Sequence, residues 1–249
     1  MIPRPSTPRA RRMIVMGAIA AIALWALVAY IIMPRLWTIR MHRHPALADA
    51  PTITHTGSGI PGDALNVALI GSEDMIVRGM IAAGWHPADP ITLKSSERIV
   101  VDTILHRPYE DAPVSNLYLW GRKEDLAYEQ PIGDDPKMRH HVRFWKSEKV
   151  DDQGFPLWIG AATKDERVGL SDTTGQVTHH IGPDIDAERD LVIDSLQKAQ
   201  WVAGVEWVDP FQNPREGRNG GGDRWETDGR LGVATLRTSV ATSSTKPGN

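Results

Sequence analysis

The longest apolar stretch of the chain lies near its N-terminus. It covers residues 13–33, MIVMGAIAAIALWALVAYIIM, and contains no charged side chain. A helix of this length, at about 1.5 Å per residue, crosses the roughly 30 Å hydrocarbon core of a bilayer. A buried helix of a soluble protein would show a polar face, and a cleaved signal peptide would have a shorter apolar region. The pattern therefore predicts an uncleaved transmembrane helix.

The rest of the chain alternates short apolar runs with turn clusters rich in Asp, Gly and Pro. Alternation at a period of two predicts strands, and apolar residues three and four positions apart predict helices. Ser72 is expected to cap the first of these helices and Gly84 to end it. The predicted strands are 65–71, 116–122, 140–146, 156–163, 176–181, 201–208 and 231–236, and the predicted helices are 72–84, 95–107 and 186–200. These elements indicate an α+β domain with a mixed sheet of about six to seven strands and three helices, preceded by one transmembrane helix.

The same pattern divides the chain into five segments. A basic N-terminal tail (1–12) precedes the transmembrane helix (13–33), and a polar connector rich in Pro, Gly and Thr follows it (34–62). The folded domain is expected over 63–238, and the Ser/Thr-rich end, 239–249, is expected to be a disordered tail.

Charge is distributed unevenly along the chain. The formal net charge is −3, but residues 1–44 carry seven arginines and no other charged residue, so the remaining residues have a net charge of −10. An acidic body without a basic stripe argues against nucleic acid as a partner, because nucleic-acid binding depends on neutralising phosphates. The absence of cysteine excludes disulfides, thiolate nucleophiles and cysteine-type zinc sites.

Several long motifs point to a known family. They are DAPVSNLYLWGR, RHHVRFW, PLWIGAAT, TGQVTHHIGPDIDAERD and GRNGGGD. In these motifs the chain resembles the LssY-like C-terminal domain family from about Leu65 to Leu236. The resemblance implies a domain of bacterial membrane proteins, in some of which it is joined to DedA-like segments or to membrane phosphatases of the phosphatidic acid phosphatase type. It implies no particular activity, and it indicates that residues 219–236 belong to the fold.

The arginines around the apolar run bear on the membrane orientation. Four precede it and three follow it, so the positive-inside bias is small. A short Arg-rich tail resists translocation, whereas a long acidic domain crosses largely regardless of charge. With the resemblance, this predicts a single-pass protein of the bacterial inner membrane, with its N-terminus inside and its domain outside the cytoplasm. The expected partners are the lipid bilayer and other membrane proteins of the cell envelope.

Two histidine doublets, His140-His141 and His179-His180, are the strongest candidates for a functional site. Side chains alternate along a strand, so His141 shares a face with Arg143, while His140 lies on the other. If the two doublet strands are neighbours, His140 would meet His179 on the more apolar face, and His141 would meet His180 on the other. The candidate ligand-binding residues are Arg139, His140, His141, Arg143, Thr178, His179, His180, Asp184, Asp186 and Arg189.

A metal is one interpretation of these residues. Neutral imidazole is a common ligand of transition metals, and a carboxylate completes many such sites. His179, His180 and Asp184 are therefore the candidate ligands of a divalent metal, with an open position for a water that would favour hydrolysis. Without metal, the same groups would suit acid–base work, with an arginine holding a phosphate or carboxylate.

The structural alternative needs no ligand. Asp186 would cap the following helix, acids in the first turn would complement its dipole, and each histidine would be a hydrogen-bonded core residue. GRNGGGD resembles a phosphate-binding loop, but it lacks the strand-to-helix context and the Lys-Ser/Thr ending, so it is interpreted as a turn between strands.

Three functions fit the sequence. The first is a membrane-anchored extracytoplasmic domain that binds a small anionic ligand or a metal at a His/Asp/Arg cleft. The second is a metal-dependent hydrolase acting on phosphoesters, and the third is a structural or interaction subunit of a bacterial membrane complex. The sequence leaves open whether the protein is an enzyme.

Overall fold

The computed structural model divides the chain into two compact units, Met1–Ala48 and Asp49–Asn249. It describes residues 8–33, 35, 47, 50–88, 116–133, 138–173, 175 and 177–238. The helix predicted at 95–107 and the tail predicted at 239–249 lie outside these residues.

The first unit is helical. Helix α1, Pro8–Leu27, continues into a short π-helical turn, η1, Val28–Ile32. The stretch Arg12–Ile32 is long and apolar enough to cross a membrane, and its side chains are not buried against other parts of the chain. An exposed apolar helix of this length is stable only where something apolar replaces water around it, which supports the prediction of a membrane anchor.

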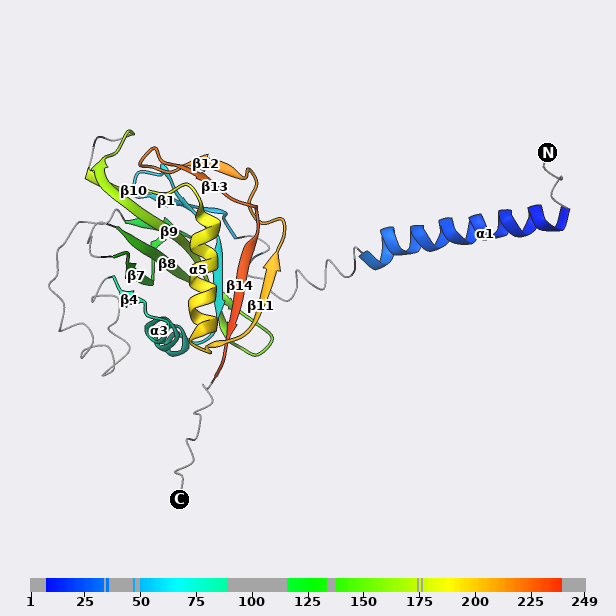
Figure 1. The fold of residues 1–249 in the computed structure, drawn as a ribbon, viewed down its shortest axis with the longest axis horizontal. Helices are drawn as coiled ribbons and strands as arrows, with labels where there is room; N and C mark the ends of the chain where they lie inside the picture. The colour runs from blue at the N-terminus through cyan, green and yellow to red at the C-terminus, as the bar shows by residue number, and fades with distance from the viewer. Residues whose placement is uncertain are drawn as a thin grey trace, which may run out of the picture. The chain divides into compact units, whose positions relative to one another are not determined.

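The second unit is built on a mixed eight-stranded sheet. Its strands follow the order β11-β14-β3-β9-β8-β7-β4, and β10 pairs with the far end of β9 (Figure 1). The β14–β3 pair is parallel and the other pairs are antiparallel. The strands are β3 (Val67–Ile70), β4 (His86–Pro87), β7 (Leu126–Pro131), β8 (Arg139–Val150), β9 (Pro156–Leu170), β10 (Val177–Ile181), β11 (Val202–Val208) and β14 (Leu231–Leu236). The prediction of an α+β fold with a mixed sheet is confirmed.

Two helices pack on one face of this sheet. Helix α3, Glu73–Ala82, begins at Ser72, whose hydroxyl accepts a hydrogen bond from the Met75 amide, and ends before Gly84, which has φ +84°. Helix α5, Ile185–Lys198, lies across the strands (Figure 1). Between helices and sheet lies the main core, which includes Val67, Leu69, Ile76, Met80, Val142, Phe144, Trp158, Val192 and Leu196.

A buried amide fixes the start of α5 to the middle of the sheet. The Asn66 amide nitrogen donates to the carbonyl oxygens of Ala162 and Ile185, at 2.9 and 2.6 Å. Its oxygen accepts from the Ala162 amide at 2.9 Å. Asn66 is fully buried, so these bonds join β9 to the first turn of α5 without leaving a polar atom unpaired.

The strand order differs from one predicted arrangement. Asp165 of β9 pairs with Arg139 of β8 on one side and with Ile181 of β10 on the other. Strand β9 therefore lies between the two histidine strands, and the hypothesis that they are neighbours is wrong. The reason is a non-local one: β9 has 15 residues, and its far end extends past β3, so that β10 finds a free edge there.

Two small sheets also belong to the described part of the domain. One has the order β2-β1-β5-β6, with β1 at Ile53–Thr56, β2 at Pro61–Ala64, β5 at Leu117–Leu119 and β6 at Arg122–Lys123. The other is the hairpin β12–β13, Glu216–Arg218 and Arg224–Glu226. The segment predicted as a connector thus contains β1 and the start of β2. The strand predicted at 116–122 is a hairpin, because Trp120 and Gly121 both have positive φ and turn the chain back.

Candidate functional site

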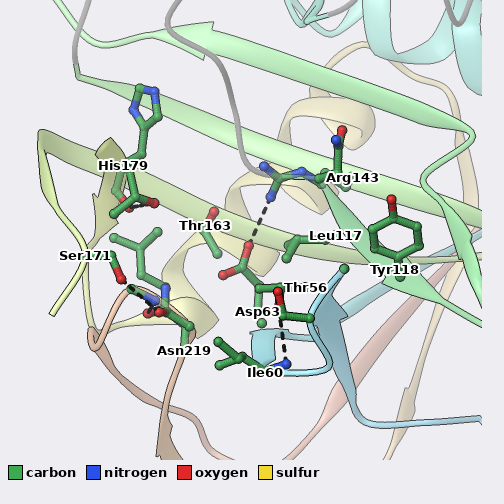
Figure 2. A pocket seen from close by; sticks show the side chains of 18 of the residues that line it. Thr56, Ile60, Asp63, Leu117, Tyr118, Arg143, Thr163, Ser171, His179 and Asn219 are labelled. Atoms are coloured by element: carbon green, nitrogen blue, oxygen red, sulfur yellow. Dashed lines mark hydrogen bonds and ion pairs between the residues drawn. The ribbon is translucent and has the colours of Figure 1, made fainter. Parts of the chain in front are cut away.

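A cavity of about 280 Å³ lies where the face of the large sheet opposite the helices meets the small sheet (Figure 2). Strands β1, β2 and β5 form one wall, β8, β9 and β10 form another, and the glycine-rich loop before β13 closes it. We call this cavity the pocket. Its lining residues are Thr56, Gly57, Ser58, Ile60, Gly62, Asp63, Asn116, Leu117, Tyr118, Arg143, Thr163, Asp165, Ser171, Thr178, His179, Ile181, Asn219, Gly220 and Gly221.

A buried ion pair forms the centre of the pocket wall. Arg143 Nη1 donates to Asp63 Oδ2 at 3.0 Å, and the two side chains point toward one another in Figure 2. Arg143 Nε lies 3.9 Å from Glu124 Oε1, and neither this Nε nor Glu124 Oε2 has a hydrogen-bond partner although both are buried. Burial raises the pKa of Asp63, while the Arg143 guanidinium opposes that rise. The wall is thus polar, and the buried groups behind it are incompletely hydrogen-bonded.

A second charged group lies beside it. Arg139 donates from Nε to Asp165 at 3.0 Å, from Nη1 to Glu129 at 2.8 Å, and from Nη2 to His179 Nε2 at 3.3 Å. Because a guanidinium only donates, Nε2 must accept, and the neutral His179 ring carries its hydrogen on Nδ1, which lies 3.4 Å from Asp165. Burial and the arginines lower the pKa of His179, although Asp165 opposes them. The buried His141 has its pKa lowered further, by burial and then by Arg143 and Arg139. Both rings are therefore uncharged at neutral pH.

The loop Asn219–Asp223 is held to the pocket by several contacts. The Asn219 side chain lies close enough to Asp63 to lower the pKa of that carboxyl, and the Ser171 hydroxyl donates to the Gly220 carbonyl at 3.2 Å. At the outer end, Asp223 Oδ1 lies 2.6 Å from His180 Nδ1. A Cβ on Gly220 would stand 3.1–3.2 Å from Thr56 and Pro61, so glycine lets the loop approach the small sheet closely.

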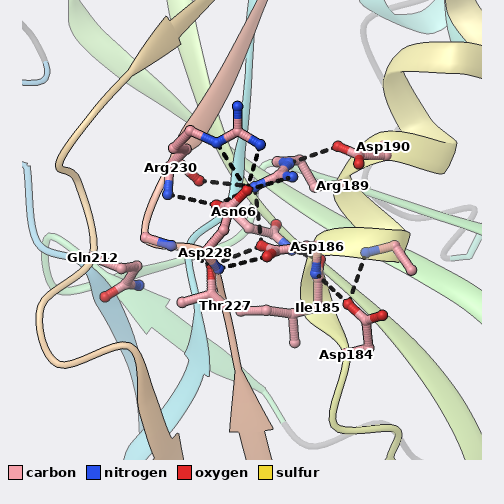
Figure 3. Close-up of polar contacts among 12 residues, drawn as sticks. Asn66, Asp184, Ile185, Asp186, Arg189, Asp190, Gln212, Thr227, Asp228 and Arg230 are labelled. Carbon is pink, nitrogen blue, oxygen red and sulfur yellow. Dashed lines mark hydrogen bonds and ion pairs between the residues drawn. The ribbon is translucent and has the colours of Figure 1, made fainter.

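A different polar cluster surrounds the start of α5, and we call it the Arg189 cluster (Figure 3). Arg189 is 1% exposed. It donates to Asp190 at 2.8 Å, to Asp186 at 2.9 Å and to Asp228 at 3.0 and 3.3 Å, and also to the Arg230 carbonyl at 3.2 Å. The guanidinium groups of Arg189 and Arg230 lie 4.8 and 4.7 Å from the Trp207 ring centre. Every nitrogen of Arg189 is used, so this cluster is a structural tie between α5 and the chain before β14.

The structure separates the predicted site residues into groups. Arg143, Thr178 and His179 line the pocket, and Arg139 and His141 lie beside it on the same face of the sheet. His140 lies on the helix face, where its Nδ1 is 2.7 Å from Glu188. His180 contacts Asp223, outside the lining.

The three remaining candidates belong to the start of α5. Asp184 is the helix cap, because its carboxylate accepts from the Asp186 and Ala187 amides at 3.2 and 3.1 Å. The structural alternative had given that role to Asp186, and this assignment is wrong: Asp186 instead pairs with Arg189 and accepts from Thr227.

The proposed metal ligands have separate partners. His179 faces Arg139 and Asp165, His180 faces Asp223, and Asp184 caps α5. Within the part of the chain that the structure describes, no group of three or more His, Asp or Glu side chains is placed to hold a metal ion. The prediction of a divalent metal at these residues gains no support from the geometry.

Several pocket residues were missed at the level of sequence. Asp63 directly follows the segment interpreted as a connector, and Asn219 lies in a loop interpreted as a plain turn. Asp165 was detectable: continuing the alternation of the strand past Ala161 places Thr163 and Asp165 on the face of Arg143.

Comparison with known proteins identifies the domain. Residues 47–231 match the family described as LssY C-terminus. The matched residues make up most of the chain and nearly all of the second unit. The chain belongs to this family, as its motifs indicated. No curated protein and no solved structure matches it.

Proposed function

We propose that this chain is a membrane-anchored domain that binds a small polar ligand in the pocket. The observation that supports it best is the buried ion pair Asp63–Arg143 at the wall of a cavity. Burying such groups costs free energy that an apolar wall would not cost. A ligand that forms hydrogen bonds with these two side chains explains why the chain places them there.

The two other predicted functions have less support. A metal-dependent phosphoesterase needs a ligand group for its metal, and the described residues supply none at the predicted positions. A purely structural subunit needs no cavity lined by charged side chains. The ion pair of Arg139 with Asp165 is not explained by packing alone.

The membrane setting is part of the proposal. The apolar helix anchors the chain, with the N-terminus in the cytoplasm and the domain outside, in the inner membrane of a bacterium. A reporter that is active only in the cytoplasm, fused after residue 249, should be inactive. Activity of that reporter would reverse the orientation.

Thermal unfolding of the full chain in detergent tests binding. A ligand at ten times its Kd adds about 1.4 kcal/mol and raises Tm by about 3–5 °C. The test set holds uncharged sugars, sugar phosphates, inorganic phosphate and amines, so that every charge class is represented.

A variant that fills the pocket provides the control. Thr178 lines it, so Thr178→Trp should abolish the shift. Thr173, which is exposed and outside the lining, is the matched site, and Thr173→Trp should keep it. No saturable shift with any compound, or equal shifts in both variants, would overturn the proposed function.

A further inference from the structure

The charges of the pocket indicate which class of ligand it takes. We infer that the ligand is an uncharged, polyhydroxylated ring of about the size of one sugar. This inference rests on the proposed function and specifies the substrate class of the same site.

The charged side chains in the lining compensate one another. Asp63 is paired with Arg143 at 3.0 Å, and Asp165 is held by Arg139 at 3.0 Å, with the His179 ring uncharged beside it. An anionic ligand would therefore meet two carboxylates and no uncompensated cation among the described lining residues. A cationic ligand would compete with the two arginines for the same carboxylates. An uncharged ligand avoids both costs.

The remaining polar groups are suited to hydroxyls. Six hydroxyl side chains line the pocket: Thr56, Ser58, Tyr118, Thr163, Ser171 and Thr178. A hydroxyl both donates and accepts, and so does each hydroxyl of a sugar. The carboxylates of Asp63 and Asp165 add strong acceptors, because hydrogen bonds to an ionised group are about twice as strong as neutral ones.

Size and apolar surface agree with a single ring. Pockets for drug-sized ligands have volumes of about 300–1,000 Å³, and the 280 Å³ of this one is just below that range. Leu117, Ile181 and the Tyr118 ring supply apolar surface among the polar groups. A sugar ring has the same mixture, with C–H groups on its faces and hydroxyls at its edge.

Matched compounds test the class. The full chain, in a detergent without a sugar headgroup, is titrated calorimetrically with D-glucose, myo-inositol, glucose 6-phosphate, glucosamine and inorganic phosphate. We expect saturable binding of at least one uncharged ring, at least tenfold tighter than glucose 6-phosphate or glucosamine.

The substitution Asp63→Asn sharpens the test. It keeps the shape of the side chain but leaves Arg143 without its carboxylate partner at β2. The preference should reverse, with weaker binding of the uncharged ring and tighter binding of glucose 6-phosphate. Asp172→Asn, at an exposed position of the neighbouring loop outside the lining, should change neither. Loss of structure alone would weaken both ligands together, so the reversal is specific to the charge.

The outcomes separate the two proposals. Tighter binding of phosphate, glucose 6-phosphate or glucosamine by the wild type would overturn the uncharged class and leave a ligand-binding pocket. Binding of the uncharged ring that Asp63→Asn leaves unaltered would place that ring elsewhere and also overturn the inference. Absence of binding by every compound would overturn the inference together with the proposed function.

Discussion

The Arg189 cluster and the pocket are built from the same residue types but differ in how completely these residues are hydrogen-bonded. In the Arg189 cluster, all three guanidinium nitrogens of the buried arginine have acceptors, three of them carboxylates. Arg143 of the pocket is also buried, but its Nε has no hydrogen-bond partner, and neither has Oε2 of the neighbouring Glu124. Complete hydrogen bonding fixes one geometry of the Arg189 cluster, whereas the side chains around Arg143 are held by fewer hydrogen bonds.

The two regions also differ in what surrounds them. Arg189 is covered by the Trp207 ring and joins a helix to the chain that enters β14. Arg143 faces a cavity whose walls come from two sheets and a glycine-rich loop. Burial alone therefore does not distinguish the two arginines. The number of their donors that have a hydrogen-bond partner does.

The largest expected effect is the removal of Arg189. Arg189→Met leaves Asp186 and Asp190 without their cation and Asp228 with Arg230 alone, and it should lower the free energy of unfolding by about 3–5 kcal/mol. Arg189→Lys, which keeps the charge but not the fork of donors, should lie between this variant and the wild type. Denaturant unfolding of the full chain in detergent measures both. A loss below 1 kcal/mol for Arg189→Met would show that the cluster does not hold α5.

The next largest effect is that of acid, because the two regions should lose their contributions to stability at different pH values. The folded-state pKa values of His141 and His179 lie below the ordinary 6.5, so the unfolded chain binds more protons below that value. The contribution of the two histidines to the free energy of unfolding is thus complete above pH 6.5. It falls as the pH decreases, by up to about 1.4 kcal/mol per pH unit for each histidine. Burial alone would raise the pKa of Asp228, but hydrogen bonds from Arg230 and Arg189 lower it to about 2. The Arg189 cluster should therefore lose its contribution only between about pH 4 and 2.

Unfolding measured from pH 7.5 to 5 checks this order. His141→Gln should reduce the slope by about one proton, because glutamine does not titrate. If the free energy of unfolding of this variant changed with pH as steeply as that of the wild type, His141 would bind no additional proton on unfolding.

Two threonine substitutions should give smaller effects, one on ligand affinity and the other on stability. Thr163→Val removes a buried hydroxyl from the pocket and should weaken the uncharged ring about threefold to tenfold. Thr227→Val removes the hydroxyl that donates to Asp186 at 2.7 Å, and should cost about 0.5–1.5 kcal/mol of stability with unchanged affinity. Titration calorimetry and thermal unfolding on both variants make the comparison. If both lost affinity equally, the two regions would not be independent.

The smallest effect is expected at an exposed pair of the same chemistry. Arg78 donates to Asp74 at 2.8 Å on the surface of α3, where the side chains are 49% and 63% exposed. Arg78→Gln should change the free energy of unfolding by about 0.3–0.5 kcal/mol, since water screens such pairs. Denaturant unfolding measures this change, which is the reference value for an exposed ion pair against which Arg189→Met is compared. A loss comparable to that of Arg189→Met would contradict the role assigned to burial.

Local signals in the sequence predicted much of the fold. Ser72 and Gly84 mark the ends of α3 through capping chemistry, which acts over three or four residues. The alternation around Arg143 correctly separated His140 from His141. Such features depend only on neighbouring residues, so a single sequence carries them.

Non-local pairing could not be predicted in the same way. The position of β9 between the histidine strands depends on how far β9 extends past β3, which no short segment encodes. Asp63 was hidden because Pro61 and Gly62 are typical of a linker, yet here they belong to an edge strand, where a missing amide costs no ladder bond. The pocket combines residues from both ends of the domain, so its composition emerges only from the assembled sheets.

The single parallel pair of the large sheet has a practical consequence for anyone who shortens this chain. Strand β3 pairs with β14, the last strand described. During synthesis, this edge of β3 therefore stays uncovered until β14 has been made. A polypeptide cut at residue 231, where the family match stops, would lack nearly all of β14 and expose the apolar edge of β3 to self-association. Expression trials should therefore extend at least to residue 238, and ribosome-bound intermediates shorter than that should need a chaperone.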